Sequence, residues 1–146
     1  MTDTPPRPGI GVGACIVRDG AVLLVLRLRE PEAGCWGLPG GKVDWGEGVR
    51  AACAREIAEE LGLAITPGHL LCMADTIDAG DGMHWTAPVY LVEDCEGDPM
   101  VMEPDKLGGC GWFPLDALPE RVTRATVAAV KALRPSTRPS GPAQDD

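Results

Sequence analysis

The junction between a glycine-rich stretch, residues 34–48, and a helical pattern over residues 49–61 constrains this chain most. The apolar residues that recur at helical spacing are Ala54, Ile57, Ala58 and Leu61. Gly62 follows them in the position of a C-terminal cap. The pattern predicts an amphipathic helix beside a loop whose backbone can approach a ligand closely.

Strand-like runs lie on both sides of this helix. Strands are predicted over residues 10–17, 21–29, 69–77, 83–92 and 110–114. An Asp-Gly turn signal at 18–20 and a glycine-containing turn at 79–82 each join two of them. A second amphipathic helix is predicted over 121–133. Strands before and after one central helix predict an α/β fold with a mixed sheet.

The length of 146 residues suits one domain. We assign residues 1–133 to that domain and expect residues 134–146, rich in Pro, Ser and Gly, to be a disordered tail. The first residues lack the apolar core of a signal peptide, and no apolar run is long enough for a membrane span. The six scattered cysteines form no C-x-x-C pair, so we expect reduced thiols and a cytoplasmic location.

The net charge of -9, from 22 acidic and 13 basic residues, repels phosphate at long range. It argues against binding to a nucleic-acid polymer. A polyanionic small substrate would therefore need a bound cation to offset its repulsion by the protein.

Three glutamates, Glu56, Glu59 and Glu60, lie at i, i+3 and i+4 and project from one side of the predicted helix. Carboxylates about 5 Å apart repel by roughly 3 kcal/mol per pair at an effective dielectric near 20. Such a face either stays solvated or holds a cation such as Mg²⁺ or Mn²⁺. The adjacent Gly40 could offer a backbone carbonyl to that cation, and Glu47 could bind Arg55 and fix the loop to the helix.

The whole pattern, Gly41-x5-Glu47-x7-Arg55-Glu56-Ile57-x-Glu59-Glu60-x-Gly62-Leu63, resembles the box of the Nudix hydrolases with every signature position filled. By residue usage alone it recurs in on the order of one window in a billion. Weaker likeness to the MutT-like nucleoside triphosphate diphosphatases extends over residues 7–13, 36–41 and 102–106. The resemblance implies a Nudix α/β/α sandwich with a central mixed β-sheet, and release of pyrophosphate or phosphate from a nucleotide.

The resemblance also implies roles for individual residues. The implied metal ligands and catalytic carboxylates are Glu56, Glu59, Glu60 and Glu103, with the Gly40 carbonyl as a further ligand for Mg²⁺ or Mn²⁺. Glu59 or Glu103 would act as general base, although Glu103 is equally readable as a turn residue before Pro104. The structural positions of the box are Gly41, Glu47, Arg55 and Gly62.

Several residues are candidates for substrate binding. Arg27 and Lys42 would contact phosphate, although Arg27 could equally be an exposed strand residue, and Gly41 is a further candidate for substrate binding. The candidates for stacking on a base are Trp36, Trp45, His84 and Trp85. Trp112 is expected in the core, and the glycines at 9, 11 and 13 would leave room on a strand for the base.

The predicted activity is metal-dependent hydrolysis of a phosphoanhydride bond in a nucleoside tri- or diphosphate, in the sense of nucleotide-pool sanitation. An alternative is an ADP-ribose or ADP-sugar pyrophosphatase, disfavoured because the proline usual about fifteen residues after the box is missing near Ile77 and Asp78. An alternative of another class is a non-catalytic nucleotide-sensing Nudix domain. The expected partners are a small nucleotide and, by family habit, a second copy of the chain; no membrane is expected.

Overall fold

The computed structural model describes residues 6–77 and 82–134. The elements, in chain order, are β1 (Gly9–Arg18), β2 (Ala21–Arg27), β3 (Trp36–Gly37), β4 (Gly40–Lys42), α1 (Val49–Leu61), β5 (Leu70–Ile77), β6 (His84–Val92), β7 (Leu107–Pro114) and α2 (Arg124–Leu133). Most of the predicted turn at 79–82 and all but the first residue of the predicted tail at 134–146 lie outside the described residues.

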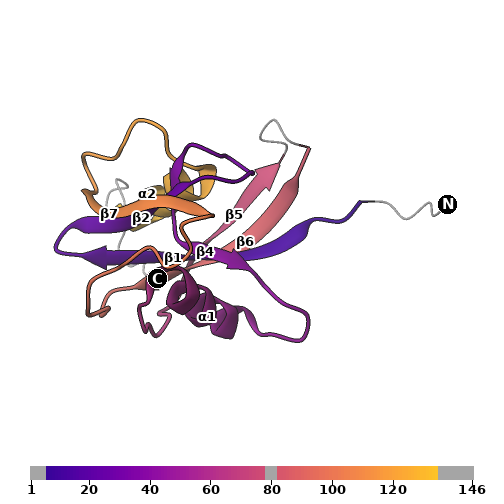
Figure 1. The fold of residues 1–146 in the computed structure, drawn as a ribbon, viewed down its shortest axis with the longest axis horizontal. Helices are drawn as coiled ribbons and strands as arrows, with labels where there is room; N and C mark the ends of the chain where they lie inside the picture. Colours follow the sequence, from indigo (N-terminus) through magenta and orange to yellow (C-terminus); the bar gives the residue numbers. More distant parts are fainter. Residues whose placement is uncertain (1–5, 78–81, 135–146) are drawn as a thin grey trace, which may run out of the picture.

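The strands form one mixed sheet (Figure 1). Its order is β3-β2-β1-β6-β5, with β4 paired to β1 and β7 paired to β2. The pair β1 and β6 is parallel, whereas the other pairs are antiparallel. The mixed sheet predicted from the sequence is confirmed.

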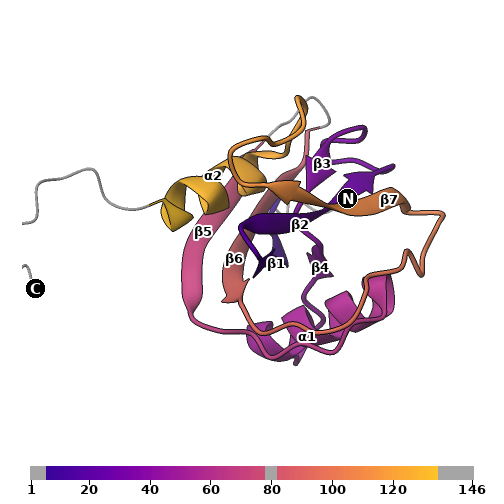
Figure 2. The same ribbon diagram turned by 90° about the vertical axis from the view of Figure 1, so that its left-hand side faces the viewer.

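The two helices cover opposite sides of the sheet, α1 against β1 and β4 and α2 against β5 (Figure 2). Successive strand residues point to opposite faces, so each strand supplies both layers. On β2, Leu23 packs in the cluster under α1, whereas Leu24 packs in the cluster under α2. Burying each such side chain stabilises the fold by about 1.5–3 kcal/mol. The predicted α/β/α layering is confirmed.

Two short strands, β3 and β4, were not predicted. Both lie in the glycine-rich stretch and have too few side chains to show alternation. Likewise β7 begins at Leu107 rather than at residue 110, because Gly108 and Gly109 remove the apolar pattern there. In each case, pairing with a neighbouring strand defines the element.

Two predicted boundaries move inward. The strand expected to reach residue 29 ends at Arg27, where its register with β7 shifts. The helix expected from residue 121 begins at Arg124, because the Thr123 side chain accepts a hydrogen bond from the Thr126 N–H as its N-cap. Neither helix of the described residues is long and apolar enough to cross a membrane.

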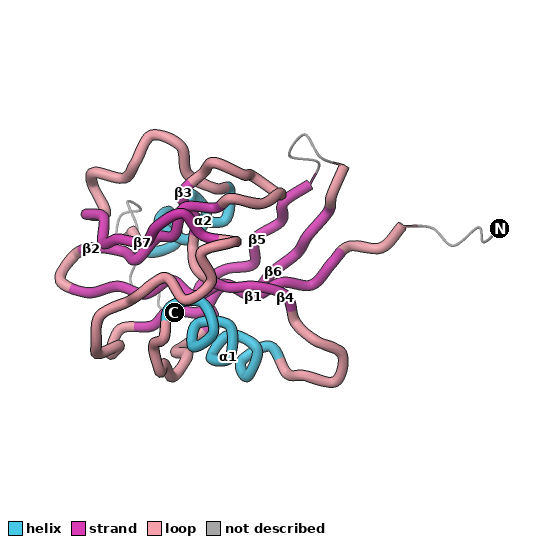
Figure 3. The backbone as a smooth tube through the Cα atoms, in the orientation of Figure 1, coloured by secondary structure: helices cyan, strands magenta, loops and turns pink. Residues whose placement is uncertain are grey.

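The connection between β6 and β7 is loop in Figure 3. It passes the C-terminal end of α1, where the Met100 N–H donates to the Leu61 carbonyl and the Met102 N–H donates to the Glu60 carbonyl. This path brings Glu103 toward the carboxylates of the helix.

Candidate active site

Helix α1 carries a carboxylate on its buried face. Ile57 and Leu61 are fully buried, as expected, but Ala58 is exposed and the Glu60 side of the helix faces inward. Glu60 is only 8% exposed. A buried carboxylate is costly unless it gains partners, so its surroundings indicate what it is for.

One partner of Glu60 comes from the glycine loop. The Gly40 N–H donates to Glu60 Oε1 at 3.0 Å. Burial, with the negative charges of Glu56 and Glu103, nevertheless raises the pKa of Glu60 to about 8, although the Gly40 hydrogen bond and Arg27 oppose the shift. The carboxylates of Glu56, Glu60 and the predicted Glu103 therefore lie close enough to influence one another electrostatically.

Glu56 lies against Gly41. A Cβ atom at Gly41 would lie 2.3 Å from the carboxyl carbon of Glu56, so only glycine leaves room for this carboxylate. Burial raises the pKa of Glu56, and Arg55 partly opposes the shift. The box therefore needs glycine at this position for a packing reason.

Arg55 ties the loop to the helix. Its guanidinium donates to both Glu47 oxygens, at 2.7 and 2.9 Å, and to the Lys42 carbonyl at 3.0 Å. It also bonds Glu56 at 3.2 Å and Glu59 at 3.1 Å. The hydrogen bonds from Arg55 lower the pKa of Glu47 to about 2, and the same contacts raise the pKa of Arg55. The expected pairing of Glu47 with Arg55 is present.

The two candidates for general base differ in their contacts. Glu59 is half exposed and lies 3.1 Å from Arg55. Glu103 is partly buried, lies 3.7 Å from Lys106, and contributes to the charge around Glu60. Glu103 therefore shares the field of the buried carboxylate, while Glu59 faces solvent.

The donor set matches a hard divalent cation in kind, because carboxylate oxygens are the ligands that Mg²⁺ prefers. Burial is the main cause of the raised pKa values of Glu56 and Glu60, and a cation beside them would favour their charged forms. Within residues 6–77 and 82–134, no three carboxylate, imidazole or thiol groups converge closely enough to form a metal cluster. Instead, Arg55 and the Gly40 N–H hold the side chains. The Gly40 carbonyl as a ligand remains a prediction.

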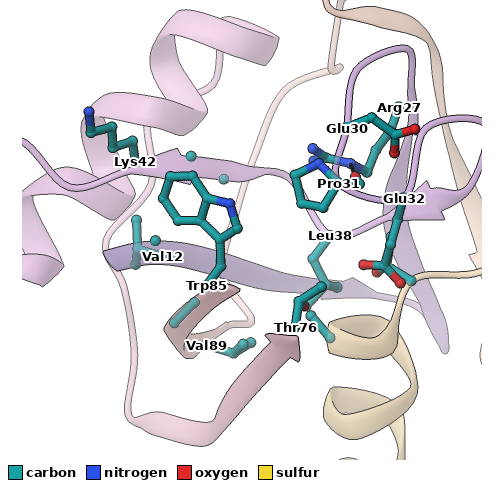
Figure 4. Close-up of a pocket in the computed structure, with 17 residues that line it drawn as sticks. Val12, Arg27, Glu30, Pro31, Glu32, Leu38, Lys42, Thr76, Trp85 and Val89 are labelled. Carbon is teal, nitrogen blue, oxygen red and sulfur yellow. Dashed lines mark hydrogen bonds between the residues drawn. The ribbon is translucent and has the colours of Figure 1, made fainter. Parts of the chain in front are cut away.

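A cavity of about 260 Å³ opens beside this site (Figure 4). Its volume lies just below the ~300–1,000 Å³ range of small-molecule sites. The lining residues come from the glycine loop, from one face of β1 and β6, from the C-terminal end of β2 and from the start of α2. The lining includes Gly11, Arg27, Glu32, Leu38, Gly41 and Trp85.

The structure brings some predicted substrate residues to the cavity. Arg27, Gly41, Lys42 and Trp85 line it. The Arg27 Nε donates to the Pro31 carbonyl at 2.7 Å, so its guanidinium is partly engaged by the neighbouring loop.

Other predicted residues lie elsewhere. His84 is exposed and does not line the cavity, because neighbouring residues on β6 point to opposite faces. Trp45 is fully exposed, and Trp36 packs on Phe113 with ring centroids 4.9 Å apart. Trp112 packs against the core cluster under α1, as expected, with the Arg18 guanidinium 4.6 Å from its ring centroid.

Glycines on β1 explain the position of Trp85. A Cβ at Gly9 would lie 2.5 Å from its indole ring, so the glycine leaves room for the tryptophan itself. Gly11 and Gly13 line the cavity, which agrees with the predicted open strand face.

Sequence reasoning missed the loop before β3. Glu30, Pro31 and Glu32 line the cavity, together with Thr76 and Thr123. None of these belongs to a recognisable pattern; Glu30, Pro31 and Glu32 follow Arg27 closely on the chain, whereas Thr76 and Thr123 come from distant segments.

Comparison with known proteins supports the resemblance. The model of the NUDIX domain matches residues 7–133. A crystal structure of a MutT NUDIX hydrolase from Burkholderia pseudomallei is 55% identical, with a TM-score of 0.84 over 88% of this chain and 100% of that one. "Putative 8-oxo-dGTP diphosphatase 2" of Mycobacterium tuberculosis is 44% identical over 97 residues, 64% of this chain and 67% of that protein.

A third relative has a different printed activity. ADP-ribose pyrophosphatase of Methanocaldococcus jannaschii is 33% identical over 113 residues, which cover 77% of this chain and 66% of that protein. Since the domain match spans most of the sequence and includes the helix and loop described above, this chain is a hydrolase of the NUDIX family.

Proposed function

We propose that this enzyme hydrolyses a phosphoanhydride bond in a nucleoside tri- or diphosphate and that it uses Mg²⁺, with Mn²⁺ as a substitute. The observation that carries the proposal is the buried Glu60, held by the Gly40 N–H and sharing its field with Glu56 and Glu103. This group lies next to a cavity that Gly41, Lys42 and Arg27 line.

In the proposed mechanism, Glu56 and Glu60 hold the cation together with one of two further glutamates, Glu59 or Glu103. When bound, such a cation polarises phosphate oxygens and lowers the pKa of water. The other member of this pair, which is then not a direct ligand, accepts the proton of the attacking water. Arg27 and Lys42 contact the phosphates from the cavity.

The proposed substrate is a nucleoside triphosphate or diphosphate, in the sense of nucleotide-pool sanitation. The name of the Mycobacterium tuberculosis relative supports this class. ADP-ribose is the second candidate, because the Methanocaldococcus jannaschii relative is an ADP-ribose pyrophosphatase. A non-catalytic nucleotide sensor is the third, although all the box carboxylates are present.

We also propose a cytoplasmic location and retain the predicted homodimer. All six cysteines are free thiols, which suits a reducing compartment. The proposed ligand is a small nucleotide rather than a nucleic-acid polymer, in keeping with the net charge of -9.

The test is phosphate and pyrophosphate release from a panel of nucleotides and ADP-ribose, with Mg²⁺ or Mn²⁺, by wild type, Glu56→Gln and Glu60→Gln. We expect each variant to lose ~100-fold or more of kcat on the preferred nucleotide. Glu120→Gln, an exposed carboxylate on another part of the chain, is the control and should keep wild-type rates.

Two results would change the assignment. Turnover of ADP-ribose without turnover of any nucleoside tri- or diphosphate would favour the second candidate. Binding without turnover of any compound in the panel would favour the sensor.

A further inference from the structure

The loop over residues 28–35 is one wall of the cavity and is anchored from two sides. From β2, the Arg27 Nε donates to the Pro31 carbonyl at 2.7 Å. From the start of α2, the Arg124 N–H donates to Glu32 Oε2 at 2.9 Å. The wall is therefore fixed before any ligand binds.

Glu32 has an unusual backbone in this loop. Its φ is +60°, in the left-handed region that non-glycine residues rarely adopt. Such a conformation persists only where the surroundings hold it, and these residues cluster at ligand sites. Glu32 is held by the Arg124 N–H at its carboxylate and by the Cys35 N–H, which donates to its carbonyl at 3.2 Å, and it lines the cavity.

The carboxylate of Glu32 can accept further hydrogen bonds. A carboxylate offers about four lone-pair positions, and the Arg124 N–H uses one of them. Among the described residues, no second hydrogen bond to this carboxylate is present. A ligand in the cavity can therefore offer it two further donors.

The opposite wall suits a flat ring. Figure 4 shows the Trp85 indole on one side of the cavity and Pro31 and Glu32 on the other. Leu38 and Ala87 add apolar lining between the strands. A phosphate would be repelled by Glu32, whereas an aromatic base can lie along the indole and present its edge to the carboxylate.

The edge that fits must present adjacent N–H donors. Guanine does so, with its ring N1–H beside its 2-amino group. In adenine and cytosine the amino group lies next to an acceptor nitrogen, which a carboxylate would repel. Hypoxanthine keeps the ring N–H but lacks the amino group.

We propose that Glu32 is the residue that selects the base, accepting hydrogen bonds from N1–H and the 2-amino group of a guanine-type nucleotide. The proposal rests on the proposed function, since it names the base of that nucleotide. Glu30 does not share this role: it is exposed, and its Oε1 accepts from the Ala33 N–H of its own loop at 3.1 Å.

The test measures binding, so it does not depend on hydrolysis. Calorimetric titrations compare GMP with IMP, which lacks the 2-amino group, for wild type, Glu32→Gln and Glu93→Gln. We expect wild type to bind GMP roughly 10- to 100-fold more tightly than IMP, the size of one hydrogen bond to a charged group. Glu32→Gln should lose most of that ratio, because the amide is neutral and offers one acceptor oxygen instead of two. Glu93→Gln, at an exposed carboxylate directly after β6 that does not line the cavity, should keep it.

Two results would overturn the proposal. Equal affinity of wild type for GMP and IMP would show that the 2-amino group is not read. An equal weakening of GMP and IMP by Glu32→Gln would show that this residue shapes the loop without reading the base. Neither result bears on hydrolysis, which the Glu56 and Glu60 variants test separately.

Discussion

At the scale of single residues, the site is organised by two glycines and one arginine. Gly40 gives its N–H to Glu60, and Gly41 leaves the space that the Glu56 carboxylate fills. Arg55 compensates the charge around them by binding Glu47, Glu56 and Glu59. Residues of the box therefore serve the packing of the loop against the helix as well as the chemistry of the site.

The ion pair of Glu47 and Arg55 predicts a pH dependence of stability. The pKa of Glu47 falls from 4.5 to about 2 in the folded state, so folding favours its charged form. Its stabilising contribution is therefore present above pH 4.5 and is lost as the pH falls toward 2. We expect Glu47→Gln to lower the melting temperature at pH 7. The difference in melting temperature from wild type, called the gap below, should shrink as the pH falls from 4.5 toward 2.

Thermal melts at several pH values, followed by circular dichroism, measure that gap. Glu120→Gln is the control, since its exposed carboxylate should give a small gap with no trend. A gap for Glu47→Gln that stays constant down to pH 2 would contradict the assigned ion pair.

At the scale of elements, the start of α2 joins the second helix to the cavity. Thr123 is buried, caps the helix through Thr126, and its methyl group leaves no room for a side chain at Gly37. The next residue, Arg124, holds Glu32 in the cavity wall. One helix terminus therefore positions parts of β3 and of the loop before it.

The cap predicts a difference between two variants. Thr123→Ala and Thr123→Ser both lose the methyl group, but only alanine loses the hydroxyl that accepts from the Thr126 N–H. We expect the serine variant to be more stable than the alanine variant by about 1 kcal/mol. Urea denaturation of both proteins gives the two free energies of unfolding, and equal values would show that the cap contributes little.

At the scale of the whole molecule, charge opposes the proposed substrate. The protein carries -9 and the nucleotide is also anionic, so their approach is slowed by repulsion at low ionic strength. Salt screens exposed charges beyond about 8 Å at physiological ionic strength. We expect kcat/KM to rise as KCl increases from roughly 0.01 to 0.15 M, with kcat unchanged.

Initial rates at fixed free Mg²⁺ test this. A kcat/KM that falls with salt would contradict the effect of net charge and would point to attraction by Arg27 and Lys42 at the cavity.

The sequence by itself determined the helix, the pairing of Glu47 with Arg55 and the cluster of glutamates. These depend on spacing along a few turns of chain, which helical periodicity converts directly into geometry. It also indicated the strands with alternating side chains, and the resemblance added Glu103.

Only the tertiary structure decided which carboxylate is buried and which residues surround the cavity. Glu60 is buried because β4 and its loop pack over one side of α1, a contact that helical periodicity cannot predict. Glu32, Thr76 and Thr123 meet Trp85 through strand pairing and helix packing across the chain. Contacts between distant segments depend on how the layers stack, so no local pattern records them.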